Sequence, residues 1–165
     1  MRRTLTGACR HQDLSVDELY LLYGVSRHRR GFGYRVAVEL ERRGFTFFIV
    51  HPEAEQIDRW QPIRSLTQLS QTPHAAILCS PAAESGRILA ELDKTGVRRV
   101  FASWGSLDQA GYAVAAERGL DVCEDCPLLH MKGLGFPHNL HRGIVRWMRR
   151  PARKAQQVQD AVGSP

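Results

Sequence analysis

Short apolar runs alternate with segments of helical periodicity along most of this chain. The runs have the length and composition of buried strands, and they are expected at 19–26, 45–52, 74–81, 97–105 and 120–125. Between them, apolar residues recur at helical spacing over 33–44, 81–96 and 106–119. This order predicts repeated strand–helix–strand units with right-handed crossovers.

The pattern therefore predicts an α/β fold. We expect a Rossmann-like three-layer domain with a mostly parallel five-stranded sheet and helices on both faces. Residues at the element boundaries agree with this prediction. Ser80 and Ser106 are placed to cap helix N-termini, and Pro81 suits a first helical position. Glycines mark the expected helix ends at Gly44, Gly96 and Gly119.

Length and composition indicate one globular domain. A chain of 165 residues with 43% hydrophobic and 24% charged residues can bury a core. We expect a single domain over 1–150, which includes a basic amphipathic helix from about His138, and a flexible C-terminal tail over 151–165. No segment has the apolar length of a membrane span, and the basic N-terminus lacks the apolar region of a signal peptide. A cytoplasmic protein with no membrane partner is expected.

The loop after the first predicted strand combines glycines with positive charge. The net charge of +6 favours an anionic partner. In an open parallel sheet, ligands bind beyond the carboxyl ends of the strands, where the first strand–helix turn presents backbone N–H groups. Gly24, Gly31 and Gly33 lie in that turn, and charge-assisted donors come from Arg27, Arg29, Arg30 and Arg35. The structural alternative is a tight turn whose arginines form a solvated basic edge. The position of this loop, at the carboxyl end of the first strand, favours a phosphate site.

The residues near these glycines narrow the type of nucleotide. A dinucleotide fingerprint needs G-x-G-x-x-G and an acidic residue at the end of the second strand, whereas this strand ends in His51 and Pro52. NAD is therefore disfavoured, although Glu53 and Glu55 come soon afterwards and NADP stays open as an alternative. No G-K-[ST] is present, so a P-loop ATPase is not expected.

Cysteines and basic residues near the C-terminus allow two further interpretations. Cys123 and Cys126 form a C-x-x-C without a second cysteine pair, so no metal site is predicted, while a redox role stays open. A redox sensor or an NAD(P)-dependent oxidoreductase is thus one alternative function. A nucleic-acid-binding module, driven by the basic loop and by Arg146, Arg149 and Arg150, is the other and is not favoured.

Several short motifs, in this order, resemble a known family. "GVS" is followed by "YRVAVEL", the second strand ends in "VHP", the third ends in "CSP", and "CEDCP" follows the last strand. From about Leu19 to Cys126 the chain resembles the small stand-alone coenzyme A-binding domain proteins, whose Rossmann-like fold is similar to the nucleotide domain of succinyl-CoA synthetase. No single motif is specific to this family, but the order of the motifs along the chain is.

The resemblance implies a set of ligand contacts. The backbone of Gly24, Val25 and Ser26, with the Ser26 hydroxyl, would hold the pyrophosphate, and Tyr34 and Arg35 would border it. The adenosine and pantetheine would lie along His51, Pro52, Ser80, Pro81 and Gly105. Ser103 stands where many relatives have glutamine, and Cys79 and Ser80 stand where many have basic residues. The arginines of the first loop, Arg27 and Arg30 in particular, are expected to supply the positive charge that is missing before Pro81.

These observations predict a binding protein. Coenzyme A or an acyl-CoA is the expected ligand. No nucleophile, base and orienting acid converge in the sequence, so an enzyme is not predicted.

Overall fold

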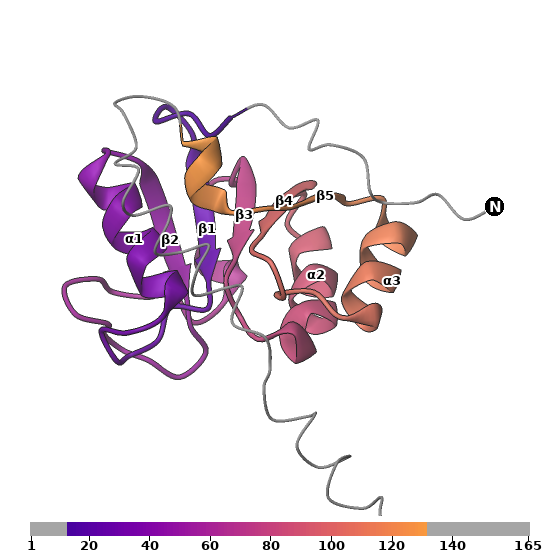
Figure 1. Ribbon diagram of the computed structural model, residues 1–165, viewed down its shortest axis with the longest axis horizontal. Coiled ribbons are helices and arrows are strands. Elements are labelled where there is room, and N and C mark those ends of the chain that lie inside the picture. Colours follow the sequence, from indigo (N-terminus) through magenta and orange to yellow (C-terminus); the bar gives the residue numbers. More distant parts are fainter. Residues whose placement is uncertain (1–12, 132–165) are drawn as a thin grey trace, which may run out of the picture. The chain divides into compact units, whose positions relative to one another are not determined.

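The computed structural model describes residues 13–131, in which helices pack against a central sheet (Figure 1). Residues 1–12 and 132–165 lie outside the described part. The basic helix expected from His138 and the tail expected at 151–165 also lie there. No helix within 13–131 is long and apolar enough to cross a bilayer.

Within residues 13–131, five strands form one sheet, and all of its neighbouring pairs are parallel. The strands are β1 (Leu19–Tyr23), β2 (Thr46–Val50), β3 (Ala75–Leu78), β4 (Arg99–Ala102) and β5 (Asp121–Glu124). Their order across the sheet is β2-β1-β3-β4-β5. β1 and β3 are buried throughout, as expected for central strands of a parallel sheet. The predicted α/β fold is confirmed.

The helices divide between the two faces of the sheet. α1 (Phe32–Arg42) lies on one face and contacts the 3₁₀ turn η3 (Pro127–His130). α2 (Ser85–Asp93) and α3 (Gln109–Arg118) pack on each other on the opposite face (Figure 1). Two more 3₁₀ turns are η1 (Leu66–Gln68) and η2 (Ala82–Glu84). The structure thus has the three layers that the alternation of strands and helices predicted.

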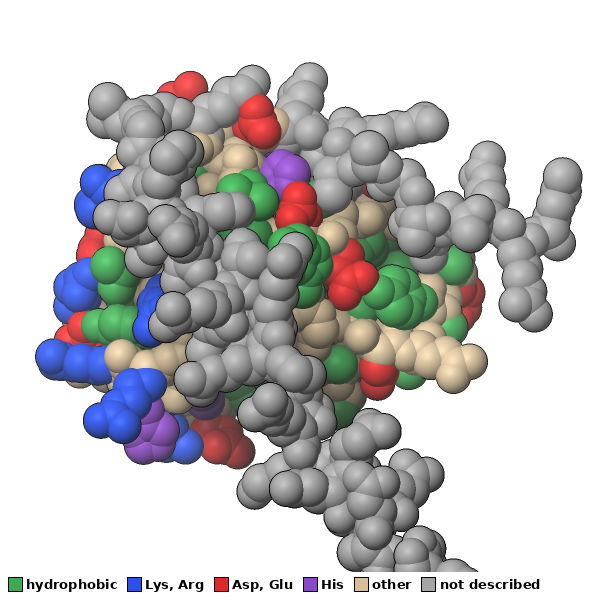
Figure 2. Space-filling view, in the orientation of Figure 1, with side chains coloured by type: hydrophobic (Ala, Val, Ile, Leu, Met, Phe, Trp, Pro, Cys, Tyr) green, Lys and Arg blue, Asp and Glu red, His purple; other side chains and the backbone are tan. Residues whose placement is uncertain are grey.

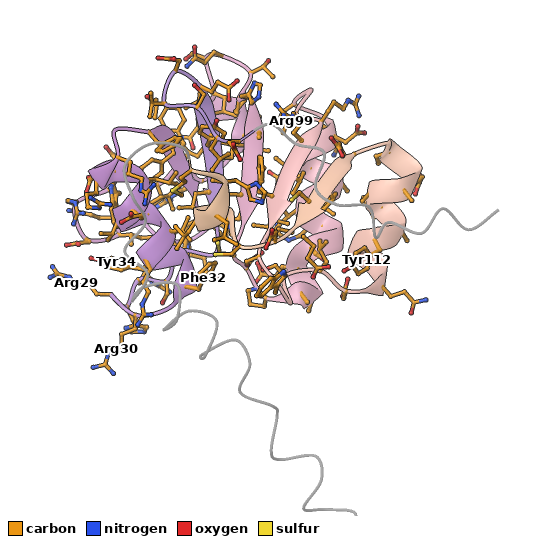
Figure 3. All side chains as sticks on the ribbon, turned by 45° about the horizontal axis from the view of Figure 1, so that its top comes forward. Arg29, Arg30, Phe32, Tyr34, Arg99 and Tyr112 are labelled. Carbon is orange, nitrogen blue, oxygen red and sulfur yellow. The ribbon has the colours of Figure 1, made fainter. Side chains whose placement is uncertain are left out.

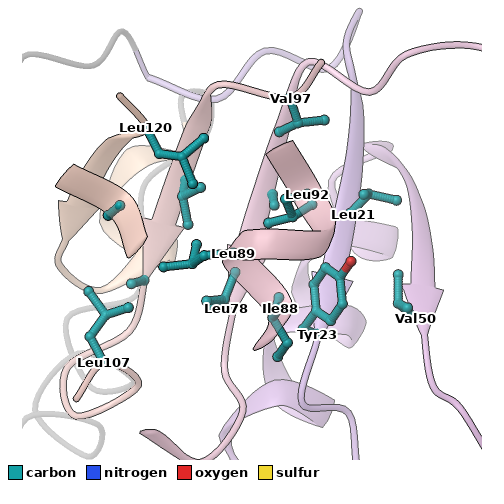
Figure 4. Close-up of a cluster of buried hydrophobic side chains, with 14 of the residues drawn as sticks. Leu21, Tyr23, Val50, Leu78, Ile88, Leu89, Leu92, Val97, Leu107 and Leu120 are labelled. Carbon is teal, nitrogen blue, oxygen red and sulfur yellow. The ribbon is translucent and has the colours of Figure 1, made fainter. Parts of the chain in front are cut away.

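Alternate residues of β1 serve the two faces of the sheet. Leu21 and Tyr23 belong to a cluster of buried hydrophobic residues, to which α2 contributes Ile88 and Leu89 (Figure 4). Tyr20 points to the other face, where its ring meets the ring of Phe45 edge-on at 6.0 Å between centroids. Since both faces of β1 are covered, the strand is apolar at every position.

Two of the predicted helix caps are wrong. Ser80 does not cap a helix, because η2 intervenes and α2 begins only at Ser85. At α3 the N-cap is Asp108, whose side chain accepts a hydrogen bond from the Gly111 N–H at 2.8 Å. The Ser106 hydroxyl instead forms a 2.6 Å hydrogen bond with the Ser103 hydroxyl inside the loop after β4.

All five strands end in line at one edge of the sheet. The register aligns Tyr23 with Val50 and Leu78, Leu78 with Ala102, and Ala102 with Glu124. The loops that follow β1, β2 and β3 therefore leave the sheet side by side. β1 and β3 are neighbours whose following helices lie on opposite faces, and a crevice is expected where connections diverge in this way.

A buried carboxylate on α1 gives the fold a testable pH dependence. Glu39 is 7% exposed and accepts hydrogen bonds from Arg42 and Arg43, each at 2.7 Å. The Arg42 guanidinium, together with that of Arg43, lowers the pKa of Glu39 from 4.5 to about 2. A carboxyl whose pKa is lower in the folded state stabilises the fold above its unfolded pKa and loses that contribution as the pH falls.

We expect the stability of the wild type to fall between about pH 4.5 and pH 2, and this loss to be smaller in Glu39→Gln by the share that Glu39 contributes. Urea denaturation at a series of pH values measures the free energy of unfolding of both proteins. Glu117→Gln, on the exposed side of α3, is the matched control and should follow the wild type. An identical pH profile for Glu39→Gln and the wild type would contradict the prediction.

Candidate functional site

A cleft of about 390 Å³ opens at the edge where the strands end. The loop after β1, the loop after β2 and the start of the β3–α2 connection form its base, and one side of α2 forms a wall. Its lining residues are Tyr23, Gly24, Val25, Ser26, Val50, His51, Pro52, Glu53, Arg64, Ser80, Pro81, Glu84, Arg87, Ile88 and Glu91. The cleft therefore lies at the divergence of the β1 and β3 connections.

Gly24 lets two of these loops meet at backbone distance. Its φ is +83°, and a Cβ built there would lie 2.3 Å from the carbonyl carbon of Cys79 and 2.3 Å from the Ser80 nitrogen. No side chain fits that space. Gly24 was predicted to admit a phosphate, but its missing side chain is first required for contact between the loops after β1 and β3.

Gly33 allows a similarly close backbone contact at the start of α1. A Cβ there would lie 2.2 Å from the Gly24 carbonyl oxygen, so the first turn of α1 packs directly on the loop. Gly31 precedes the helix with a φ of +109°, and no side chain caps the N-terminus of α1. The first turn of α1 is thus set against the loop after β1.

His51 presents a defined hydrogen-bonding edge. Its Nδ1 accepts hydrogen bonds from the backbone N–H groups of Glu53 at 3.2 Å and Ala54 at 3.0 Å. Since Nδ1 is an acceptor, a neutral ring carries its proton on Nε2 and has that N–H left to donate. The residue lines the cleft, as the sequence predicted, and can offer this donor to an acidic ligand.

The arginines of the first loop differ in position. Arg27 Nη2 lies 3.6 Å from Glu53 Oε2, which lines the cleft. Arg29 pairs with Asp58 at 2.8 Å, and Arg30 is exposed. Figure 3 shows Arg29 and Arg30 extending away from the sheet, and Figure 2 shows basic side chains gathered on the side of α1. Of these three arginines, Arg27 is the one that forms an ion pair with a residue lining the cleft.

Tyr34, expected beside the pyrophosphate, is engaged elsewhere. Its hydroxyl donates to Asp58 Oδ2 at 2.6 Å, and its ring meets that of Trp60 edge-on. This hydrogen bond raises the pKa of Tyr34 and lowers the pKa of Asp58. Through these contacts Tyr34 connects α1 with the loop between β2 and η1. It does not line the cleft.

Two other predicted residues also lie outside the cleft lining. Arg35 is exposed on α1. Gly105 lies in the loop after β4, where its N–H donates to Glu124 Oε1 at 3.4 Å. The structure brings together Gly24, Val25, Ser26, His51, Pro52, Ser80 and Pro81 from the predicted set, whereas Arg27, Arg30, Tyr34, Arg35 and Gly105 do not line the cleft.

Sequence reasoning missed the wall that α2 provides. Arg87, Ile88 and Glu91 lie on α2, and Glu84 ends η2 directly before it. Glu84, Arg87 and Glu91 follow one another at intervals of three and four residues, which is the spacing of one helix side. Arg87 lies 3.7 Å from both Glu84 and Glu91. That spacing was the available signal, but it is equally typical of a solvated helix side. The wall carries charges of both signs.

The cysteines at this edge are not activated. Cys79 and Cys126 are free thiols, and burial raises the pKa of both, that of Cys79 to about 12. The thiolate is the reactive form, so neither thiol is poised as a nucleophile at neutral pH. Within 13–131, no group of three or more His, Cys, Asp or Glu side chains is arranged to hold a metal ion.

Solved structures with the same fold come from archaea and bacteria. A hypothetical protein from Pyrococcus horikoshii OT3 is 17% identical with a TM-score of 0.61, covering 68% of this chain and 80% of that one. A protein from Thermus thermophilus is 16% identical with a TM-score of 0.60, covering 68% of this chain and 87% of that one. At these identities the likeness concerns the fold.

A third similar structure is a much longer enzyme. The dinucleotide forming acetyl-coenzyme A synthetase 1 of Ca. Korarchaeum cryptofilum, in complex with phosphate and ADP, is 16% identical with a TM-score of 0.54. The match covers 66% of this chain and 25% of the synthetase. A search among curated proteins gives no match.

Comparison with protein families gives a match over most of the chain. The model of the CoA binding domain matches residues 18–132, which include β1 to β5, α1 to α3 and the cleft. The ordered motifs from "GVS" to "CEDCP" all fall inside this range. The chain therefore belongs to the CoA binding domain family.

Proposed function

We propose that this protein binds coenzyme A or an acyl-CoA in the cleft at the carboxyl ends of β1, β2 and β3. The observation that carries the proposal is the place of the cleft. It lies where the β1 and β3 connections diverge in a chain of the CoA binding domain family.

The pyrophosphate is assigned to the loop after β1. Backbone N–H groups of Gly24, Val25 and Ser26 and the Ser26 hydroxyl are its proposed donors. Ser26 Oγ already accepts the His28 N–H at 3.2 Å, which orders the loop. The His51 Nε2–H supplies a further donor in the cleft. The Arg27 guanidinium, 3.6 Å from the cleft residue Glu53, is proposed to supply another.

The adenosine and pantetheine are assigned to the remainder of the cleft. Pro52 and Pro81 offer apolar contact on two sides, and Ile88 offers it from α2. The proposal is one of binding, and no reaction is assigned to the site.

Titration of the full-length protein with candidate ligands tests the proposal. We expect coenzyme A and acetyl-CoA to raise the melting temperature, with about 2.7 kcal/mol of stabilisation at a ligand concentration one hundred times the Kd. NADP, NAD and ATP should have smaller effects. Retention on DNA that vanishes as the salt concentration rises would instead favour the nucleic-acid-binding alternative. Stabilisation by NADP without any effect of coenzyme A would contradict the proposal.

A further inference from the structure

Two hydroxyl groups at the base of the cleft are buried without a hydrogen-bond partner. The residues are Tyr23, at the end of β1, and Ser80, just after β3, and each is 4% exposed. The Tyr23 and Ser80 hydroxyl oxygens expose less than 1 Å² each and have no partner within the described structure. Both residues line the cleft. Because buried hydroxyls are normally paired, two unpaired ones in the same cleft indicate a site for a polar group.

Tyr23 is placed for this role by the register of the sheet. Its side chain points to the α2 side, and Figure 4 shows its ring beside Ile88 with the oxygen turned toward Val50. All three residues line the cleft. Burial, reinforced by the negative charge of Glu91, raises the pKa of Tyr23, so its hydroxyl keeps its proton and is available as a donor. Arg87 partly opposes this rise.

The surroundings favour an uncharged partner for these hydroxyls. Glu84, at the end of η2, and Glu91, on α2, line the same cleft, and Arg87 lies 3.7 Å from each of them. The charge of Glu91 acts on the Tyr23 hydroxyl, so it would repel a phosphate bound there but not a neutral acceptor.

We propose that the Tyr23 and Ser80 hydroxyls donate hydrogen bonds to an uncharged acceptor group of the bound ligand. This inference rests on the proposed coenzyme A function. In that ligand, such acceptors are the ring nitrogens of adenine and the amide carbonyls of pantetheine. Since both oxygens are now covered, binding moves a neighbouring side chain. Arg87 and Glu91, which are partly exposed and have several rotatable bonds, can make that movement.

Tyr23→Phe tests the proposal through two measurements with opposite expected signs. Without ligand, the variant should be as stable as the wild type or more stable, because an unpaired buried hydroxyl is removed. Its affinity for coenzyme A, measured by calorimetry, should fall about 2- to 12-fold, which corresponds to the loss of one neutral hydrogen bond. Ser80→Ala should behave in the same way.

Tyr20→Phe is the matched control on the same strand. The Tyr20 hydroxyl donates to Glu18 at 2.6 Å and accepts the Ser15 N–H at 2.8 Å, on the other face of the sheet. This variant should lose stability and keep its affinity for coenzyme A. The contrast separates a ligand-binding hydroxyl from a structural one.

Fragments of the ligand identify the acceptor. The same variants are titrated with adenosine 3′,5′-bisphosphate and with 4′-phosphopantetheine. Weaker binding of the first by Tyr23→Phe assigns the hydroxyls to adenine, and weaker binding of the second assigns them to pantetheine.

Two failures can be told apart. If the wild type binds coenzyme A and both variants bind it equally well, the inference is wrong and the proposed function stands. If the wild type does not bind coenzyme A, the proposed function is wrong and the inference falls with it.

Discussion

Gly24→Ala is expected to destabilise the protein by about 2 to 6 kcal/mol. Part of this loss comes from a positive φ that a side chain tolerates poorly, and part from overlap with the backbone of Cys79 and Ser80. Neither backbone can move aside without disturbing the end of β3. Urea denaturation of the variant and the wild type measures the difference in the free energy of unfolding.

Gly31→Ala separates the two causes. Gly31 also has a positive φ, at +109°, but a Cβ there meets nothing within 4 Å. We expect a loss of about 1 to 3 kcal/mol from backbone strain alone. Equal losses at Gly24 and Gly31 would show that the close approach to the β3–α2 connection does not matter for stability.

Arg27→Ala is expected to weaken the binding of coenzyme A about 10- to 150-fold. This range is the effect of losing one charged hydrogen bond of about 1.5 to 3 kcal/mol to a phosphate. Arg27 and Glu53 are both exposed, and such a pair contributes little to stability. Arg27 can therefore exchange Glu53 for a phosphate, and calorimetry at fixed salt concentration measures the result.

Glu53→Gln gives the reciprocal test, because it removes the competitor for Arg27. Binding of coenzyme A by this variant should become tighter than in the wild type. Arg30→Ala should have a smaller effect than Arg27→Ala, because Arg27 lies 3.6 Å from the cleft residue Glu53, whereas Arg30 extends away from the sheet (Figure 3). Arg118→Ala, at the end of α3, should bind as the wild type does. Unchanged affinity in Arg27→Ala would remove that side chain from the site.

The cleft residues that the sequence predicted share one property: they directly follow strands. Gly24, His51 and Ser80 come after β1, β2 and β3, and parallel strands end at a common edge. Their meeting therefore follows from topology, which the alternation of apolar runs already defines. The same reasoning cannot find Arg87 or Glu91, because which side of a helix faces a cleft depends on how the helix packs.

Tyr34 illustrates the opposite error. Its position after the glycine-rich loop suggested a contact with the ligand, but its hydroxyl binds Asp58, 24 residues away. Asp58 has a positive φ of 54° in an irregular loop, and no periodic pattern describes such a segment. The wrong cap at Ser80 has a related cause, since local sequence does not reveal where a 3₁₀ turn delays the start of an α-helix. At α3 the cap is Asp108, two residues after the predicted Ser106.

The sequence by itself determined the alternation of strands and helices, the parallel sheet and the edge at which the loops meet. These follow from hydrophobic periodicity and chain connectivity. Only the tertiary structure decided that Gly24 serves contact between two loops and that Tyr23 is buried under the cleft with its hydroxyl unpaired. Such facts depend on distances between segments far apart in the chain, and sequence patterns carry no record of those distances.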